Sequence, residues 1–247
     1  MSASLLLTHA KYQFIEQIRV PISLVASAFF PAAAMLAFVL PNIGDDPTAA
    51  TVSTASMLVF TMISATIMGL GITIADDRAQ PWDPYTRTLS AGPMVRFSAR
   101  LVTNMLIMLL AFVPVLLIAA FLTNATVTPL ELAAGIGALL LGSVPFALIG
   151  LTIGYLLPLK AAIPVTQLTF FPMAVLGGLL TNPMDLPSFI EVVSPYVPTR
   201  GAVELVWAAT IGFPVNSVAM IMFAVWIVLG GAAAVWAYKR DEGNRYS

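Results

Sequence analysis

Residues 52–100 read VSTASMLVFTMISATIMGLGITIA and then DDRAQPWDPYTRTLSAGPMVRFSAR. The composition changes from apolar to charged after Ala75, and this change indicates the fold class of the chain. The first part, Val52–Ala75, contains no Asp, Glu, Lys or Arg. It exceeds the roughly 20 apolar residues with which a helix spans about 30 Å of hydrocarbon. The second part, residues 76–100, is rich in Asp and Arg. This pattern is typical of a membrane helix that ends in a polar loop.

Five further runs of the same kind predict an all-α integral membrane protein with six transmembrane helices in a single domain, residues 1–247. The six uncharged runs are Val20–Leu40, Val52–Ala75, Leu101–Leu122, Leu132–Leu157, Ala161–Leu180 and Val215–Tyr238. The composition agrees, because 59% of the residues are hydrophobic and only 9% are charged. Soluble domains carry about 25% charged residues.

The distribution of Lys and Arg predicts the orientation of the chain. Short loops that contain these residues stay in the cytoplasm. If six runs cross the membrane, only Arg200 falls on the far side from the N-terminus. The others are Lys11, Arg19, Arg78, Arg87, Arg96, Arg100, Lys160, Lys239, Arg240 and Arg245. We therefore expect a multi-pass protein of the plasma (inner) membrane with both termini in the cytoplasm.

Two segments outside the six runs are also expected to be helical. Residues 4–19 place Leu7 and Phe14 on one helical face and Gln13 and Glu16 on the other, which favours a helix on the membrane surface. A solvated cytoplasmic lead-in is the alternative. Residues 181–214 mix apolar and acidic side chains and predict two short helices that dip into the outer interface, the second beginning at Pro198.

The residue inventory excludes several chemistries. Cysteine is absent and the one histidine, His9, precedes the first run, so a Ser-His pair or a metal site at membrane depth is excluded. No lysine follows a phosphate-binding glycine motif, and the net charge of -1 gives no indication of nucleic-acid binding. We expect no enzyme activity and no cofactor in this chain. The runs contain no ionisable group of the kind that ion-coupled transport usually needs, so energy is expected from a partner.

Three segments together resemble the permease subunits of type-2 ABC exporters (ABC-2 type), which include bacterial drug and antibiotic exporters. The first is Gln17-Ile18-Arg19-Val20-Pro21, similar to the family's Arg-x-Pro entry after a surface elbow helix. The second runs from Asp77-Arg78 through Trp82-Asp83-Pro84-Tyr85 to Gly92-Pro93, similar to the charged segment with the coupling helix. The third joins Phe171-Pro172, Gly177-Gly178 and Asn182-Pro183, similar to the end of span five and the outer re-entrant helices. Gln80-Pro81 stands where the family often has Gly-Thr.

The resemblance implies that transport and ATP hydrolysis are carried out by separate chains. Two permeases, identical or paralogous, would pair in the lipid, and each would dock on one of two separate ABC ATPase subunits that bind ATP and Mg²⁺. The residues expected to couple to the ATPase lie between spans two and three. They are Asp76, Asp77, Arg78, Trp82, Tyr85, Arg87, Leu89 and Arg96. The alternative for these residues is topogenic charge with interfacial aromatic residues.

A pathway without fixed charges suits a hydrophobic or amphipathic substrate, such as a drug-like molecule, a lipid or a lipopeptide. Spans two and five carry the candidate lining. The candidates are Thr54, Thr61, Ser64, Thr66, Gln167, Phe170, Phe171 and Met173. The alternative is that the hydroxyl groups bond to their own helix and that Gln167 ties two helices together.

Two other functions remain open at this stage. A six-span secondary transporter or channel would need no ATPase, and a structural assembly factor would transport nothing. Co-purification of an ATPase separates the exporter from both.

Overall fold

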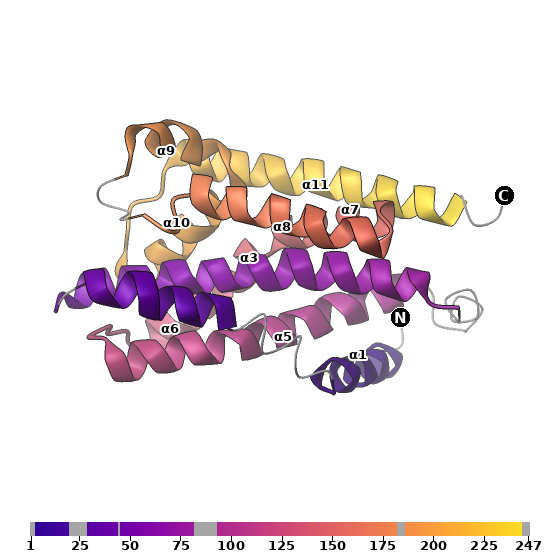
Figure 1. Cartoon of the computed structure of the whole chain (residues 1–247), viewed down its shortest axis with the longest axis horizontal. Helices are drawn as coiled ribbons and strands as arrows, with labels where there is room; N and C mark the ends of the chain where they lie inside the picture. The colour runs from indigo at the N-terminus through magenta and orange to yellow at the C-terminus, as the bar shows by residue number, and fades with distance from the viewer. Residues whose placement is uncertain (1–2, 20–28, 44, 82–92, 182–185, 244–247) are drawn as a thin grey trace.

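The computed structural model describes residues 3–19, 29–43, 45–81, 93–181 and 186–243, and these residues form helices and turns with no strand among them. The helices of the bundle lie roughly side by side along one axis (Figure 1). They are α3 (Pro47–Ala79), α5 (Pro93–Leu122), α6 (Pro129–Gly142), α7 (Val144–Leu156), α8 (Leu159–Leu176) and α11 (Ser217–Gly243). The prediction of an all-α architecture is confirmed for the described residues.

Among the described residues, five helices are long and apolar enough to cross a membrane. They cover Pro47–Ala79, Phe97–Leu122, Pro129–Leu156, Leu159–Leu176 and Ser217–Glu242, where α6 and α7 together make one span. These correspond to the last five predicted runs. The first run begins within residues 20–28, which lie outside the described part, and continues through the π-helix η1 (Met35–Val39) and the 3-10 helix η2 (Leu40–Asn42). The first of the six predicted spans therefore stays a prediction.

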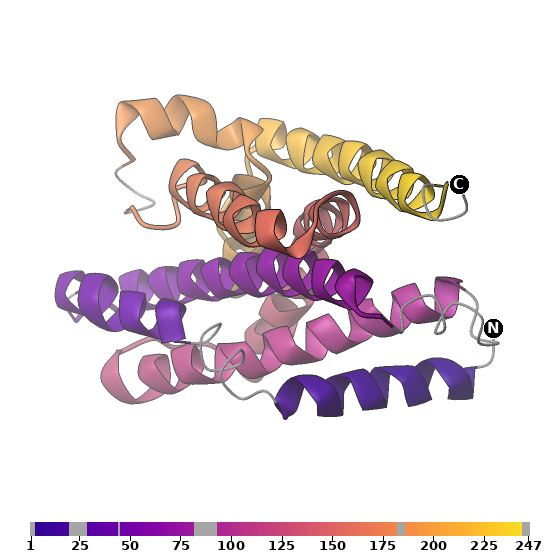
Figure 2. The same cartoon turned by 45° about the vertical axis from the view of Figure 1, so that its right-hand side comes forward.

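Both chain termini lie at the same end of the bundle, which we call the termini end (Figures 1 and 2). The short helix α1 (Ala3–Ile18) packs along α5 there. The opposite end holds α9 (Ser188–Val193), the 3-10 helix η3 (Ser194–Tyr196) and α10 (Pro198–Ile211). Helices thus form where residues 4–19 and 181–214 predict them, and their depth in a membrane stays a prediction.

The segment between spans two and three is shorter than residues 76–100 suggest. The α3 helix continues to Ala79 and α5 already begins at Pro93, beyond the uncharged runs on both sides. Helical hydrogen bonding does not require apolar side chains, so charged residues extend a helix where it leaves the apolar layer. Residues 82–92 lie outside the described part.

Local sequence signals fix where these helices begin and end. Asp46 caps α3 by accepting a hydrogen bond from the Thr48 amide at 2.9 Å, with Pro47 in the first turn. Thr128 and Glu131 form a reciprocal capping box at the start of α6. Gly212 ends α10 with φ of 67°, a left-handed conformation that costs glycine little.

The α3 helix is the centre of the bundle. It packs against α5, α7, α8 and α10, and most of its side chains are buried within this one chain. Phe60 of α3 meets Phe170 of α8 edge to face, with ring centroids 4.9 Å apart. By contrast, α5 exposes a continuous apolar face through Leu106, Leu110 and Leu117. Such a face indicates contact with lipid or another membrane helix.

Two glycines bring α7 close to α3. A Cβ atom on Gly150 would lie 3.0 Å from the carbonyl oxygen of Thr66, and one on Gly154 would lie 2.8 Å from Ile74 Cβ. Gly150 and Gly154, four residues apart, thus form a small-xxx-small pair at a helix–helix contact.

We expect Gly154→Leu to destabilise the protein by about 1–3 kcal/mol, because a leucine forces α7 away from Ile74 on the rigid α3 backbone. Gly137→Leu is the matched control, since a Cβ atom on Gly137 meets nothing within 4 Å. Thermal unfolding of both purified variants in detergent measures the difference. Equal melting temperatures would contradict the close contact.

Candidate functional site

Arg78, in the last turn of α3, joins three helices at the termini end. Its Nε donates a hydrogen bond to Asp241 Oδ1 at 2.8 Å, and its Nη2 lies 2.6 Å from the same oxygen. Its Nη1 donates to the carbonyl oxygens of Gly154 at 2.8 Å and Leu157 at 3.1 Å, at the C-terminus of α7. Only 2% of the Asp241 side chain is exposed. Arg78 therefore fastens the end of α3 to both α7 and α11.

The fork of the guanidinium group suits this position. One edge of the Arg78 guanidinium group donates to a carboxylate, and the other donates to two carbonyl groups at the end of α7. These carbonyl groups have no donor within their own helix. Beside it, Tyr155 of α7 and Tyr238 of α11 meet edge to face at 5.2 Å, and Tyr238 donates its hydroxyl hydrogen to Glu242 Oε1 at 2.6 Å. We call Arg78, Asp241 and the carbonyl groups of Gly154 and Leu157 the Arg78 clasp.

A second set of polar contacts joins α1, α3 and α5 at the same end. Arg100 of α5 forms an ion pair with Asp77 of α3 at 2.6 Å. The Thr103 hydroxyl donates to the Ala10 carbonyl oxygen at 3.2 Å, which holds α1 on α5. Asn104 Nδ2 donates to the Ala65 carbonyl oxygen at 3.0 Å. The last two bonds lie in the buried interior.

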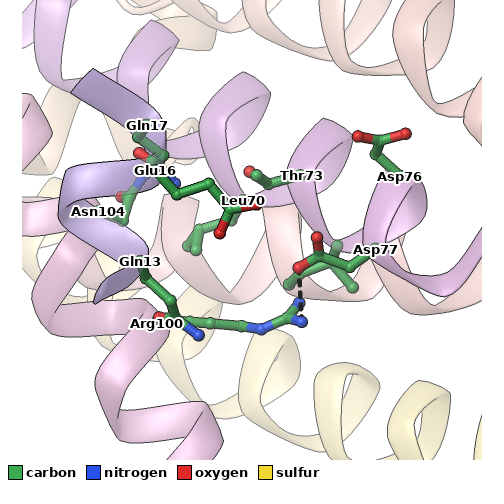
Figure 3. A pocket seen from close by; sticks show the side chains of 10 residues that line it. Gln13, Glu16, Gln17, Leu70, Thr73, Asp76, Asp77, Arg100 and Asn104 are labelled. Atoms are coloured by element: carbon green, nitrogen blue, oxygen red, sulfur yellow. Dashed lines mark ion pairs between the residues drawn. The ribbon is translucent and has the colours of Figure 1, made fainter. Parts of the chain in front are cut away.

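Asp77, Arg100 and Asn104 help to line a cavity of about 240 Å³ between the three helices. Figure 3 shows Glu16 reaching from α1 toward α3, and Asp77 facing Arg100 across an ion pair. Leu70 and Ile74 supply an apolar wall, whereas most of the other lining groups are polar. The described residues that line it are Gln13, Glu16, Gln17, Leu70, Thr73, Ile74, Asp76, Asp77, Arg100 and Asn104.

The predicted coupling residues divide into three groups in the structure. Asp76, Asp77 and Arg78 lie in the final turns of α3, where the last two already form ion pairs within the chain. Arg96 lies in α5, and its side chain is not described. Trp82, Tyr85, Arg87 and Leu89 lie outside the described residues. Their role in coupling therefore stays a prediction.

The four α3 hydroxyl groups that were predicted to line a transport path are buried inside the chain. Thr54, Thr61 and Thr66 donate to the carbonyl oxygens four residues earlier, at 2.8, 2.8 and 2.6 Å. Ser64 donates to the Thr61 carbonyl oxygen at 3.1 Å. None of the four lines either of the two cavities described here. Their contacts match the alternative in which span hydroxyls bond to their own helix.

The α8 candidates lie on different sides of their helix. Phe170 is buried against Phe60, and Met173 is half-buried. Gln167 and Phe171 instead face outward, on a surface that also exposes Ile163. The structure thus separates Gln167 and Phe171 from the hydroxyl groups of α3. A lining formed by both sets would require a second chain or a rearrangement.

Sequence reasoning missed a buried ion pair at the opposite end. Arg200 Nε donates to Glu204 Oε1 at 2.5 Å, and Glu204 Oε2 accepts from the Asn216 amide at 2.7 Å. Arg200 also lies over the Trp207 ring, 5.3 Å from its centroid. The i,i+4 spacing of Arg200 and Glu204 on a helix opened by Pro198 was the available signal.

A second cavity, of about 570 Å³, lies at the opposite end between η1, the start of α3 and the segment after α8. Val39, Val52 and Leu179 supply apolar walls, and Ser53, Ser56 and Thr181 add hydroxyl groups. This lining is amphipathic, as ligand cavities commonly are.

Comparison with known proteins supports a transport role. The chain is 25% identical over 155 residues to the "Putative transport permease YvfS" of Bacillus subtilis (strain 168). The match covers 61% of this chain and 63% of that protein, so it spans less than two thirds of the relative's length. No protein-family model matches the chain. The similarity and the apolar helices together support a permease in a membrane.

Proposed function

We propose that this chain is the permease subunit of an ATP-driven ABC exporter that moves a hydrophobic or amphipathic substrate out across the plasma membrane. The similarity to a transport permease supports the permease role. The energy source is inferred from the residues at the termini end. The observation that carries this inference is the Arg78 clasp.

The clasp gives a mechanical reason for coupling through the loop. Arg78 is the last charged residue of α3 before segment 82–92, and its guanidinium group is bonded to α7 and α11. A displacement of the loop therefore pulls on three helices rather than on one. Packed helices move as rigid elements. An ATPase that docks on the loop would thus shift much of the bundle.

A second permease copy is part of this proposal. Gln167 faces outward from α8 among apolar side chains, in a helix apolar enough to span a membrane. An amide that faces lipid lacks hydrogen-bond partners, which makes a neighbouring helix or a bound substrate favourable there. Either occupant agrees with a paired permease around a transport path.

We expect substitutions within residues 82–92 to weaken binding of the ATPase. Tyr85→Ala, Leu89→Ala and Arg87→Glu should each weaken its association by about thirty-fold, since a central interface side chain contributes about 2 kcal/mol or more. Tagged permease is purified from its own cells' membranes, and the amount of co-purified ABC ATPase is measured by quantitative mass spectrometry. Glu191→Gln, an exposed change on α9, is the control.

Normal ATPase recovery in all three variants would contradict docking on this loop. Transport that survives ATP depletion but stops when the ion gradient collapses would replace the exporter with a secondary transporter.

A change at Gln167 separates a transport role from a structural one. If Gln167 contacts substrate, Gln167→Leu should change the ratio of transport rates among several cargoes while assembly stays intact. If it only joins helices, the variant should assemble less well with unchanged ratios. Transport assays in vesicles and size-exclusion chromatography measure the two effects, with Ile163→Leu on the same face as the control.

A further inference from the structure

We propose that Thr199 and Arg200, in the first turn of α10, hold the anionic oxygen atoms of a phosphate group, either in a phospholipid head group or as free phosphate. The site lies at the end of the bundle opposite the termini, beside the cavity of about 570 Å³. This inference depends neither on the identity of the transported substrate nor on the ATPase. It rests on two buried donors, on their surroundings and on the charge at this end.

Two buried side chains at the start of α10 have hydrogen-bond donors without an acceptor. Among the described residues, the buried side-chain atoms that lack a hydrogen-bond partner are Thr199 Oγ1 and Arg200 Nη1. Thr199 is 0% exposed and Arg200 is 9% exposed. A buried donor without an acceptor costs free energy, and the cost is larger for a charged group. An acceptor at this place is therefore favourable.

The guanidinium group of Arg200 is bonded along one edge only. Its Nε donates to Glu204 Oε1 at 2.5 Å, and Glu204 Oε2 accepts from the Asn216 amide at 2.7 Å. Nη1 thus remains for another acceptor, and a guanidinium group suits the oxygen atoms of a phosphate. The helix dipole adds partial positive charge at the start of α10, where the N-cap residue Val197 provides no side-chain acceptor.

Both side chains face the turn that ends α8. The Thr199 side chain packs where a Cβ atom on Gly177 would lie, and Arg200 Nη1 lies 3.8 Å from the position of a Cβ atom on Gly178. Gly178 has a φ of 79°, a left-handed conformation that costs glycine little. Because the two donors come from one helix turn and approach one glycine pair, a single small anion can bond to both.

The outer cavity lies next to this turn. Thr181 lines the cavity, and its Oγ1 lies 3.6 Å from the same Cβ position on Gly178. On the other side of Arg200, Trp207 donates its Nε1 hydrogen to the carbonyl oxygen of Val52, which also lines the cavity. Arg200 therefore lies behind the cavity wall. A phosphate group that enters from the cavity reaches Nη1 when the half-buried Thr181 side chain turns aside.

The position of Arg200 makes a phospholipid one of the two sources of phosphate. Arg200 is the only Lys or Arg in residues 161–238, and buried basic residues in membrane proteins are rare and usually functional. Phe189, Val192 and Tyr196 are exposed on α9 and η3, just before α10, where they can contact acyl chains. Free phosphate has no apolar part, so the two sources are separable by experiment.

Native mass spectrometry of the purified full chain tests the proposal. The protein is mixed with equal amounts of phosphatidylglycerol and diacylglycerol that carry identical acyl chains, so that only the phosphate-bearing head group differs. Phosphatidylglycerol should be retained about tenfold over diacylglycerol. The double variant Arg200→Met/Glu204→Gln, which removes the guanidinium group together with its partner charge, should lose this preference. The control Arg240→Met, an exposed change at the termini end, should keep it.

Thr199→Val tests the hydroxyl group separately. Valine keeps the shape of the side chain and removes a buried donor without an acceptor, so the lipid-free protein should be at least as stable as the unmodified one. Retention of phosphatidylglycerol should fall about threefold. Thermal unfolding in detergent measures the stability. A Thr199→Val variant that unfolds at a much lower temperature would assign the hydroxyl group to the fold and overturn its role in binding.

Inorganic phosphate identifies the source of the anion. If it raises the melting temperature of the unmodified protein but not of Arg200→Met/Glu204→Gln, the site takes free phosphate. Retention of phosphatidylglycerol without such a rise assigns the site to the lipid head group. Equal retention of the two lipids, with no effect of inorganic phosphate, would overturn the proposal. So would a preference that survives in the double variant or that Arg240→Met also abolishes.

Discussion

Arg78→Ala is expected to lower the free energy of unfolding by about 3–5 kcal/mol, because it removes an ion-pair partner from the buried carboxylate of Asp241. Asp241 has 2% of its side chain exposed, and removal of Arg78 also strips the donors from the carbonyl oxygens of Gly154 and Leu157. Thermal and denaturant unfolding in detergent measure the loss. Lys239→Ala, an exposed change two residues before Asp241, should have little effect.

The Arg78→Lys variant tests the geometry of the clasp separately from its charge. Lysine keeps the positive charge but cannot present a planar fork to one carboxylate and two carbonyls at once. We expect it to recover only part of the stability. If Arg78→Lys is as stable as the unmodified protein, charge alone explains the contact. If Arg78→Ala is also fully stable, the clasp does not hold the helices together.

Glu204→Ala is expected to cost about 3–5 kcal/mol at the opposite end, since it leaves Arg200 buried and unpaired. The Glu204 side chain is 1% exposed and accepts from both Arg200 and the Asn216 amide at the start of α11. Arg200 Nη1 already lacks a hydrogen-bond partner in the buried interior. The remaining guanidinium group would then depend mainly on the Trp207 ring.

The double variant Arg200→Met/Glu204→Gln provides the matched control for this prediction. It removes both charges and retains an amide oxygen that can accept from the Asn216 amide. Replacing a buried ion pair by uncharged side chains is often close to neutral, so the double variant should regain most of the lost stability. A double variant as unstable as Glu204→Ala would show that the charge pair itself contributes the stability.

The presence of the two short helices at the opposite end was predictable because their signals are local. Pro198 and the mixed pattern of residues 181–214 indicate two short helices, and α9 and α10 form there. Predicting where the helix ends lie relative to the uncharged runs was less successful. Charge ends an apolar run without ending a helix, so α3 extends to Ala79 and α5 begins at Pro93.

The sequence by itself determined that this protein has long apolar helices, in which order they follow one another, and that most basic residues belong to one end of the helix bundle. Hydrophobic length and charge are properties of each segment alone, so they need no knowledge of neighbours. The identity of the central helix is different. Lipid is as apolar as a protein core, so composition cannot distinguish the buried α3 from helices whose sides face outward.

Only the tertiary structure decided which polar residues meet. Arg78 and Asp241 are 163 positions apart, and Thr103 and Ala10 are 93 positions apart, so no local pattern links them. Such contacts depend on how helices pack, through glycines such as Gly154 and ring contacts such as Phe60 with Phe170. The packing brings together polar groups that can form hydrogen bonds or ion pairs with each other. A polar group left unpaired in an apolar interior would cost too much free energy.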